Sequence, residues 1–232
     1  KAVEKIFEAK GRPSDNPLIV HISELSQWSA LVERIPENAM HLAKAFWPGP
    51  LTIILKKSEL IPLRTSGNLE TVGVRMPLHP IARAIISAAG VPLAAPSANT
   101  SGKPSPTTAE HCKKDLDGLV PLIVDSGKCS VGVESTVITL EGEVPRVLRP
   151  GGISVEMLTE VLGEVEVDPA VFEKLAEGAV AASPGMKYKH YSPNAKVTII
   201  KGSFEKFKAF LETQDRESTV ALVFEGEGKE HT

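Results

Sequence analysis

The chain has 232 residues, of which 26 are basic and 29 acidic, so its formal charge at pH 7 is −3. This near balance argues against a surface built mainly for nucleic-acid binding. Two cysteines are too few for a disulfide framework and favour a reducing, cytoplasmic setting, and the longest apolar runs are far too short to span a membrane.

The first third of the chain is predicted to contain helices and strands in irregular succession. Apolar residues recur at helical spacing in residues 1–10, 23–34 and 37–46. Two runs rich in β-branched residues, 18–22 and 51–57, lie between turn signals and predict buried strands.

The middle of the chain continues this pattern. Residues 71–76, 91–95 and 122–125 are predicted strands, whereas residues 79–89 and 108–114 are predicted helices. Between residues 96 and 107 lies a loop rich in Pro, Ser, Asn and Gly. Long polar loops of this kind within compact domains are usually functional.

The strands and helices that follow complete the predicted sheet. Residues 135–140 and 146–148 read as strands, and Ser154 begins a helix that ends at Leu162. Because strands and helices interleave without strict alternation, we predict an α/β fold with a twisted, mixed sheet covered by helices.

The last quarter of the chain predicts a linker and part of a second domain. A helical piece within 163–182 precedes a Pro- and Gly-containing linker at 183–193. Residues 196–201, 203–211 and 219–224 then predict a strand, a helix and a strand, the start of a small Rossmann-like α/β domain.

The predicted domain limits follow from this reading. They are a catalytic domain at 1–165, a linker or lid at 166–193, and a partial C-terminal α/β domain at 194–232. The first helix lacks an N-cap, and the last predicted strand begins a domain that is not continued, so we expect the chain to be truncated at both ends.

Two polar loops suggest a site for a polyphosphate. Lys10-Gly11-Arg12, with Asn16 close behind, supplies cations and an amide, and Pro96-Ser97-Ala98-Asn99 supplies small hydrogen-bonding groups. The sequence contains no Walker-type phosphate loop. The alternative reading is that Lys10 and Arg12 are simply a solvated helix end.

Other polar residues are harder to assign from the residues alone. Arg75 beside a sheet core requires an anionic partner, which can be a substrate carboxylate or a structural acid. His21 within an apolar strand favours a core histidine with a satisfied hydrogen bond. Because no Gly-x-Ser-x-Gly elbow or metal-ligating cluster is present, phosphoryl or nucleotidyl transfer by positioning fits best.

Six polar motifs follow one another along the chain. They are Lys10-Gly11-Arg12 with Asn16 and His21, Pro96-Ser97-Ala98-Asn99, Ser105-Pro106-Thr107, Glu134-Ser135-Thr136-Val137-Ile138, Arg149-Pro150-Gly151 and Ser183-Pro184-Gly185-Met186. Their order resembles that of a known family, the YrdC-like threonylcarbamoyl-adenylate synthases. The resemblance covers nearly the whole chain, and the linker and second domain are similar to the long, two-domain form.

The resemblance implies a nucleotidyltransferase that converts L-threonine, bicarbonate and ATP into threonylcarbamoyl-AMP and pyrophosphate. Mg²⁺ would accompany ATP as cofactor. The product would feed the modification of adenosine in transfer RNA, so transfer RNA or a tRNA-modifying transferase is an implied partner. A Thr-x-Thr-x-Tyr-Gly-Leu segment that contacts threonine in the family would precede Lys1.

The resemblance also implies roles for individual residues. The implied catalytic residues are Lys10 and Arg12. The implied ATP-binding residues are Arg12, Asn16, Thr71, Ser97, Asn99, Ser105, Arg149 and the lid residue Tyr188. The implied L-threonine-binding residues are His21, Arg75, Ala95 and Ser135.

Two other functions stay open. The same fold could serve as a module that binds double-stranded RNA or transfer RNA without catalysis, although the acidic net charge and few aromatic residues count against it. It could also be a carbamoyl-transfer domain of a larger enzyme. The linker and trailing α/β domain favour the synthase.

Overall fold

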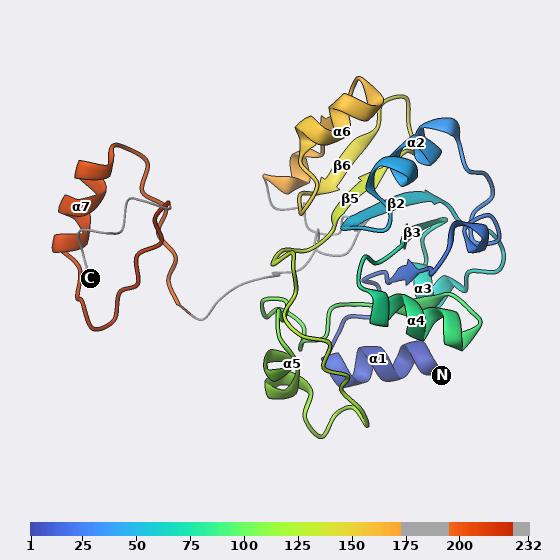
Figure 1. Ribbon diagram of the computed structural model, residues 1–232, viewed down its shortest axis with the longest axis horizontal. Coiled ribbons are helices and arrows are strands. Elements are labelled where there is room, and N and C mark those ends of the chain that lie inside the picture. Colours follow the sequence, from blue (N-terminus) through green and yellow to red (C-terminus); the bar gives the residue numbers. More distant parts are fainter. Residues whose placement is uncertain (173–194, 225–232) are drawn as a thin grey trace. The chain divides into compact units, whose positions relative to one another are not determined.

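The computed structural model describes residues 1–172 and 195–224, and the chain divides into two compact units, Lys1–Ser192 and Pro193–Thr232. The described part of the first unit contains a seven-stranded mixed sheet with helices around it (Figure 1). This arrangement confirms the predicted mixed α/β class. The predicted domain limits stay a prediction.

The sheet joins strands that are distant in sequence, in the order β4-β1-β3-β2-β5-β6-β7. Parallel pairs (β1 with β3, β2 with β5, β6 with β7) alternate with antiparallel ones. The strands are β1 (Ile19–His21), β2 (Leu51–Lys56), β3 (Thr71–Arg75), β4 (Leu93–Ala95), β5 (Thr136–Thr139), β6 (Arg146–Arg149) and β7 (Glu166–Val167).

Most helices begin and end where the sequence places caps. Thr108 and Ser154 accept hydrogen bonds from backbone amides of the first turns of α5 and α6, and Gly11 ends α1 in the left-handed region. The helices are α1 (Ala2–Lys10), α2 (Glu37–Phe46), α3 (Leu63–Ser66), α4 (Pro80–Ala89), α5 (Ala109–Leu116), α6 (Val155–Leu162) and α7 (Phe204–Glu212), with 3-10 turns η1 (Leu25–Gln27) and η2 (Pro169–Val171).

The helix predicted over residues 23–34 is wrong, since only the turn η1 forms there. The Gln27 side chain accepts hydrogen bonds from the backbone amide and hydroxyl of Ser23, at 2.8 and 3.2 Å, and such bonds compete with helix formation. Trp28, Leu31 and Val32 of this segment are still buried, and Trp28 packs against Trp47 with ring centroids 4.6 Å apart.

Three predicted strands are absent from the described residues. Residues 122–125, 196–201 and 219–224 have no ladder partner there, and apolar side chains such as Leu122 and Leu222 are exposed. A β-branched run becomes a strand only when a neighbouring strand accepts its hydrogen bonds. The described part of the second unit, 195–224, therefore contains the helix α7 and segments without regular secondary structure.

The described part of segment 163–182, in which a helical piece was predicted, contains no α-helix. Glu166 and Val167 pair with β6, and Pro169 starts the turn η2. Strand β6 provides hydrogen-bond partners for Glu166 and Val167, and Pro169 disfavours an α-helix that runs through it. Residues 173–182 lie outside the described part.

Gly151 allows the turn after β6 to lie directly against the backbone that leads into β5. A Cβ atom at this position would lie 2.3 Å from the Glu134 carbonyl oxygen and 2.5 Å from the Thr136 nitrogen. Next to it, the Thr136 hydroxyl donates to the Ile153 carbonyl at 2.6 Å. This contact fixes Glu134 and its neighbour Ser135.

Gly151→Ala is expected to lower the free energy of unfolding by about 1–3 kcal/mol, because the added methyl group must displace backbone rather than a flexible side chain. Urea denaturation measures the change. Gly132→Ala is the matched control, since its Cβ would meet nothing within 4 Å and its φ is not left-handed. Equal losses in the two variants would contradict the close approach at Gly151.

Candidate functional site: a cationic pocket at the strand ends

A pocket of about 250 Å³ lies where the parallel strands β1 and β3 end. The last residues of these strands, His21 and Arg75, are register partners, and both line the pocket with Ala95 from β4. Strand ends are where α/β sheets generally bind ligands, because loops converge there. The loops around residues 96–107 and 129–135 supply much of the remaining wall.

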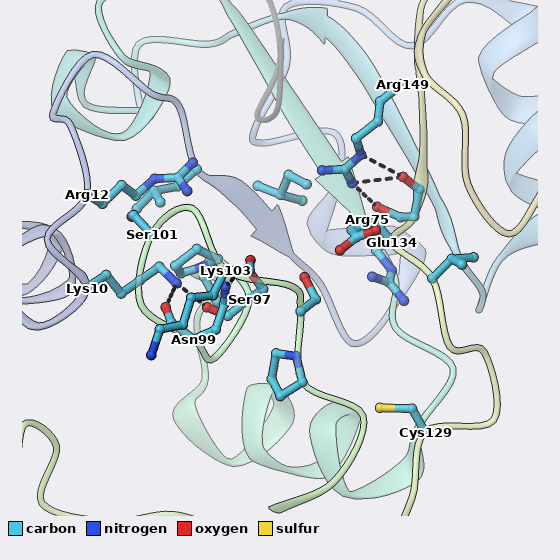
Figure 2. Close-up of a pocket in the computed structure, with 18 of the residues that line it drawn as sticks. Lys10, Arg12, Arg75, Ser97, Asn99, Ser101, Lys103, Cys129, Glu134 and Arg149 are labelled. Carbon is cyan, nitrogen blue, oxygen red and sulfur yellow. Dashed lines mark hydrogen bonds between the residues drawn. The ribbon is translucent and has the colours of Figure 1, made fainter. Parts of the chain in front are cut away.

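Positive charge dominates the pocket wall (Figure 2). The only carboxylate among the lining residues that the structure describes is Glu134. A chain with a net charge of −3 thus concentrates cations in one concave place, which suits an anionic ligand. The lining cations are Lys10, Arg12, Arg75, Lys103 and Arg149.

The Lys10 side chain is fixed by hydrogen bonds. It is therefore not a solvated side chain at a helix end, which was the alternative reading. It is buried, with 6% of the residue exposed, and its ammonium group donates hydrogen bonds to the carbonyls of Ser97 and Asn99. Burial, with a smaller effect from the charge of Arg12, lowers the pKa of Lys10 to about 8. Its implied catalytic role stays a prediction.

The Asn99 side chain also stabilises the loop around residues 97–103. Its side-chain nitrogen donates to the carbonyls of Thr100 at 3.0 Å and Lys103 at 2.9 Å. On the other side of the loop, Asp115 accepts hydrogen bonds from the Thr100 amide and the Lys103 ammonium group. Four loop carbonyls are therefore occupied by Lys10 and Asn99.

Arg12 lies on the wall but also stabilises its own loop. Its guanidinium group donates to the carbonyls of Asn16 at 3.4 Å and Pro17 at 2.8 Å. Asn16 itself is buried, with 1% exposed, and is not among the lining residues. The implied contact of Asn16 with ATP stays a prediction.

Thr71 is also absent from the wall of this pocket. It begins β3, whereas Arg75 ends the same strand at the pocket, and Thr71 instead lines a small crevice with Thr52 and Ser66. Its implied contact with ATP stays a prediction. Tyr188 lies outside the described residues.

Arg149 and Ser135 form a hydrogen-bonded pair. Figure 2 shows Arg149 on the opposite side of the view from Lys10 and Arg12. The Arg149 guanidinium donates to the Ser135 carbonyl at 2.8 Å and to its hydroxyl at 3.0 Å. The Ser135 hydroxyl also lies 2.9 Å from that of Thr52 in β2. The sheet thus fixes the direction of both side chains.

Arg75 and His21 are register partners at the strand ends, and both have lowered pKa values. Arg75 donates from Nε to the Gly49 carbonyl at 3.0 Å, and burial, then the nearby charge of Arg149, lowers its pKa. Burial is also the main reason that the pKa of His21 falls to about 4, with Arg75 adding to the effect. His21 is therefore neutral at physiological pH. It lies on the pocket wall rather than wholly in the core.

Ser97 and Ser105 line the pocket as expected. The predicted site lacked several further lining residues, among them Ser101, Lys103 and Glu134. Ser101 and Lys103 lie in the same turn-rich loop as Ser97, so the loop composition was the available signal. Glu134 was part of a quoted motif, but nothing in the sequence placed its side chain at the wall.

Within residues 1–172 and 195–224, no group of three His, Cys, Asp or Glu side chains could hold a metal ion. The same residues contain no helix of the length and apolar character needed to cross a membrane.

The depressed pKa of His21 predicts how stability depends on pH. The unfolded chain takes up a proton near the ordinary value of 6.5, whereas the folded chain resists it until about pH 4. Lowering the pH from above 6.5 to about 4 should therefore reduce the free energy of unfolding by up to about 3 kcal/mol through this residue.

Two measurements check this. Imidazole NMR should show His21 titrating near pH 4, and His21→Gln should reduce the loss of unfolding free energy between pH 7 and pH 5. An imidazole that titrates near 6.5 would contradict the buried, Arg75-facing environment.

Two family models match the chain. Residues 1–151 match the model for the Sua5, YciO and YrdC proteins, described as telomere recombination. Residues 153–231 match the model described as the threonylcarbamoyl-AMP synthase C-terminal domain.

Named relatives match over most of the chain. It is 51% identical to a threonylcarbamoyl-AMP synthase of Pyrococcus abyssi and 50% identical to one of Bacillus subtilis, in each case over 91% of this chain. These alignments cover 62% and 60% of the relatives, so the chain spans about three fifths of their length.

Solved structures agree with the fold. The structure of P. abyssi Sua5 complexed with L-threonine superposes with a TM-score of 0.87 at 51% identity, covering 91% of this chain and 62% of that one. Escherichia coli YciO gives a TM-score of 0.61 at 30% identity, covering 68% and 76%. The chain therefore belongs to the Sua5, YciO and YrdC family, in the form that carries the threonylcarbamoyl-AMP synthase C-terminal domain.

Proposed function

We propose that the protein is an L-threonylcarbamoyladenylate synthase, which forms threonylcarbamoyl-AMP and pyrophosphate from L-threonine, bicarbonate and ATP. The observation that carries the proposal is the pocket at the ends of β1 and β3, whose described lining residues include five cations and one carboxylate. Such a wall can bind both a triphosphate and the carboxylate of an amino acid. The names of the similar proteins support this assignment.

The threonine site of the proposal lies around Arg75. Its Nε atom is bound to the Gly49 carbonyl, so the rest of the guanidinium fork can receive a carboxylate. Neutral His21 and the fixed hydroxyl of Ser135 line the same pocket with Ala95. The P. abyssi protein, 51% identical to this chain, has been crystallised with L-threonine.

The phosphate site of the proposal lies across the pocket. Arg12 would neutralise phosphate charge, and Ser97 and Ser105 would donate hydrogen bonds, while Lys10 and Asn99 hold the loop that carries them. Arg149 would contact the nucleotide from the other wall. In the proposal, Tyr188 and Asn16 retain their family roles in ATP binding.

Mg²⁺ fits this pocket as an ion held chiefly by the phosphates. The wall offers one carboxylate, Glu134, and Mg²⁺ commonly binds through one or two carboxylates together with substrate phosphates. When bound, the ion would neutralise charge on the departing pyrophosphate.

The proposed chemistry depends on alignment more than on proton transfer. Threonine's neutral amine attacks the carbon of bicarbonate and, with loss of one water molecule, becomes a carbamate anion. A carbamate oxygen then attacks the α-phosphorus of ATP, and the bond to pyrophosphate breaks. Fixed cations on both walls hold the reactants and stabilise the negative charge that develops.

The cellular setting forms part of the same proposal. The product would serve a transferase that modifies transfer RNA, in the cytoplasm. The alternative function is a carbamoyl-transfer domain of the same fold.

The test is pyrophosphate release from ATP by the purified protein. We expect release that requires both L-threonine and bicarbonate, because the carbamate is the nucleophile. Retention of transfer RNA without threonine-dependent release would favour the RNA-binding module. Turnover that requires carbamoyl phosphate instead would favour the carbamoyl-transfer domain.

Arg75→Lys sharpens this test. The variant should raise the KM for L-threonine about tenfold or more and leave the KM for ATP nearly unchanged, since lysine cannot bind a carboxylate in two places. Arg83→Lys is the matched control, because Arg83 also donates from Nε to a backbone carbonyl, that of Ser23 at 3.2 Å, but does not line the pocket. Equal effects of the two variants would argue against Arg75 as the carboxylate ligand.

A further inference from the structure

Ser101 contributes a buried hydroxyl to the pocket wall that the proposed function has not used. Its Oγ atom is buried and has no hydrogen-bond partner among the described residues. The residue lines the pocket, and Figure 2 shows it on the same side as Lys10 and Arg12. A buried hydroxyl without a partner lowers stability, so its presence calls for a reason.

The backbone at Ser101 is fixed, which gives the hydroxyl a defined position. Its amide donates to the Lys10 carbonyl at 2.9 Å, the residue whose side chain binds the same loop at Ser97 and Asn99. The loop therefore meets the end of α1 through both backbone and side chain. A hydroxyl on such a loop is already positioned before a ligand arrives.

The surrounding hydrogen bonds favour an anion as the missing partner. Lys10 and Asn99 occupy the carbonyls of residues 97, 99, 100 and 103, so these acceptors are already used. Ser101 and Ser105 both carry buried hydroxyls without partners and line the same pocket. Hydroxyl donors beside Arg12 are suited to charged oxygens, to which hydrogen bonds are strongest.

We propose that the Ser101 hydroxyl donates a hydrogen bond to a β- or γ-phosphate oxygen of ATP. This inference rests on the proposed function. If Arg75 holds the threonine carboxylate, the α-phosphorus must lie toward Arg75, and the two outer phosphates then extend toward Lys10, Arg12 and Ser101 (Figure 2). Ser101 is thus a ligand of the part of ATP that leaves as pyrophosphate.

The test compares the affinity of wild type and Ser101→Ala for ATP, pyrophosphate and AMP by calorimetry. We expect the Kd values for ATP and pyrophosphate to rise about tenfold, while the Kd for AMP, which lacks the outer phosphates, stays the same. The midpoint of urea unfolding without ligand should be unchanged or higher, because the variant removes an unsatisfied polar group.

Ser66→Ala is the matched control. Ser66 is fully buried, its hydroxyl donates to the Leu63 carbonyl at 3.2 Å, and it does not line the pocket, so this variant should lose stability and keep its ATP affinity. Unchanged ATP affinity in Ser101→Ala, or equal weakening of AMP and ATP, would overturn the inference. Wild-type protein that binds neither ATP nor pyrophosphate would instead refute the proposed function on which it rests.

Discussion

The buried ammonium group of Lys10 is the interaction on which the pocket depends. It binds the carbonyls of Ser97 and Asn99, and Asn99 in turn binds the carbonyls of Thr100 and Lys103. A loop rich in backbone acceptors would normally repel a polyphosphate. Because Lys10 and Asn99 bind these carbonyls, the loop can present hydroxyl groups to an anion. The depressed pKa of Lys10 reflects the free-energy cost of burying its charge.

The opposite wall is fixed by close backbone packing. Gly151 lets the turn after β6 approach Glu134 and Ser135, and Arg149 at the end of β6 binds Ser135 in return. Helix α1 and the 97–103 loop form one wall, and the strand ends and the β6 turn form the other. Two walls with separate supports can hold two different substrates, which is what joining an amino acid to a nucleotide requires.

Much of the fold and of the site follows from local sequence. Caps at Thr108 and Ser154 and the alternation around β3 predict their elements because the determining contacts are within a few residues. The prediction of a helix over residues 23–34 was wrong because the Gln27 side chain accepts hydrogen bonds from Ser23. The predictions of strands over 122–125, 196–201 and 219–224 were wrong because strand pairing depends on partners that are distant in sequence.

The site shows the same division. Arg12, His21, Arg75, Ser97, Ser105, Ser135 and Arg149 line one pocket, as the motifs implied. Thr71 and Asn16 do not, since motif order cannot show which end of a strand or which side of a loop a residue occupies. The burial of Lys10 could not be predicted either, because it depends on carbonyls almost ninety positions away in the sequence.

The most direct test of this account is a crystal structure with a non-hydrolysable ATP analogue. This crystal structure should show the outer phosphates against Arg12, Ser101 and Ser105 while the Lys10 ammonium still binds the carbonyls of residues 97 and 99. A Lys10 side chain that no longer binds these carbonyls, or a triphosphate bound outside this pocket, would contradict the account.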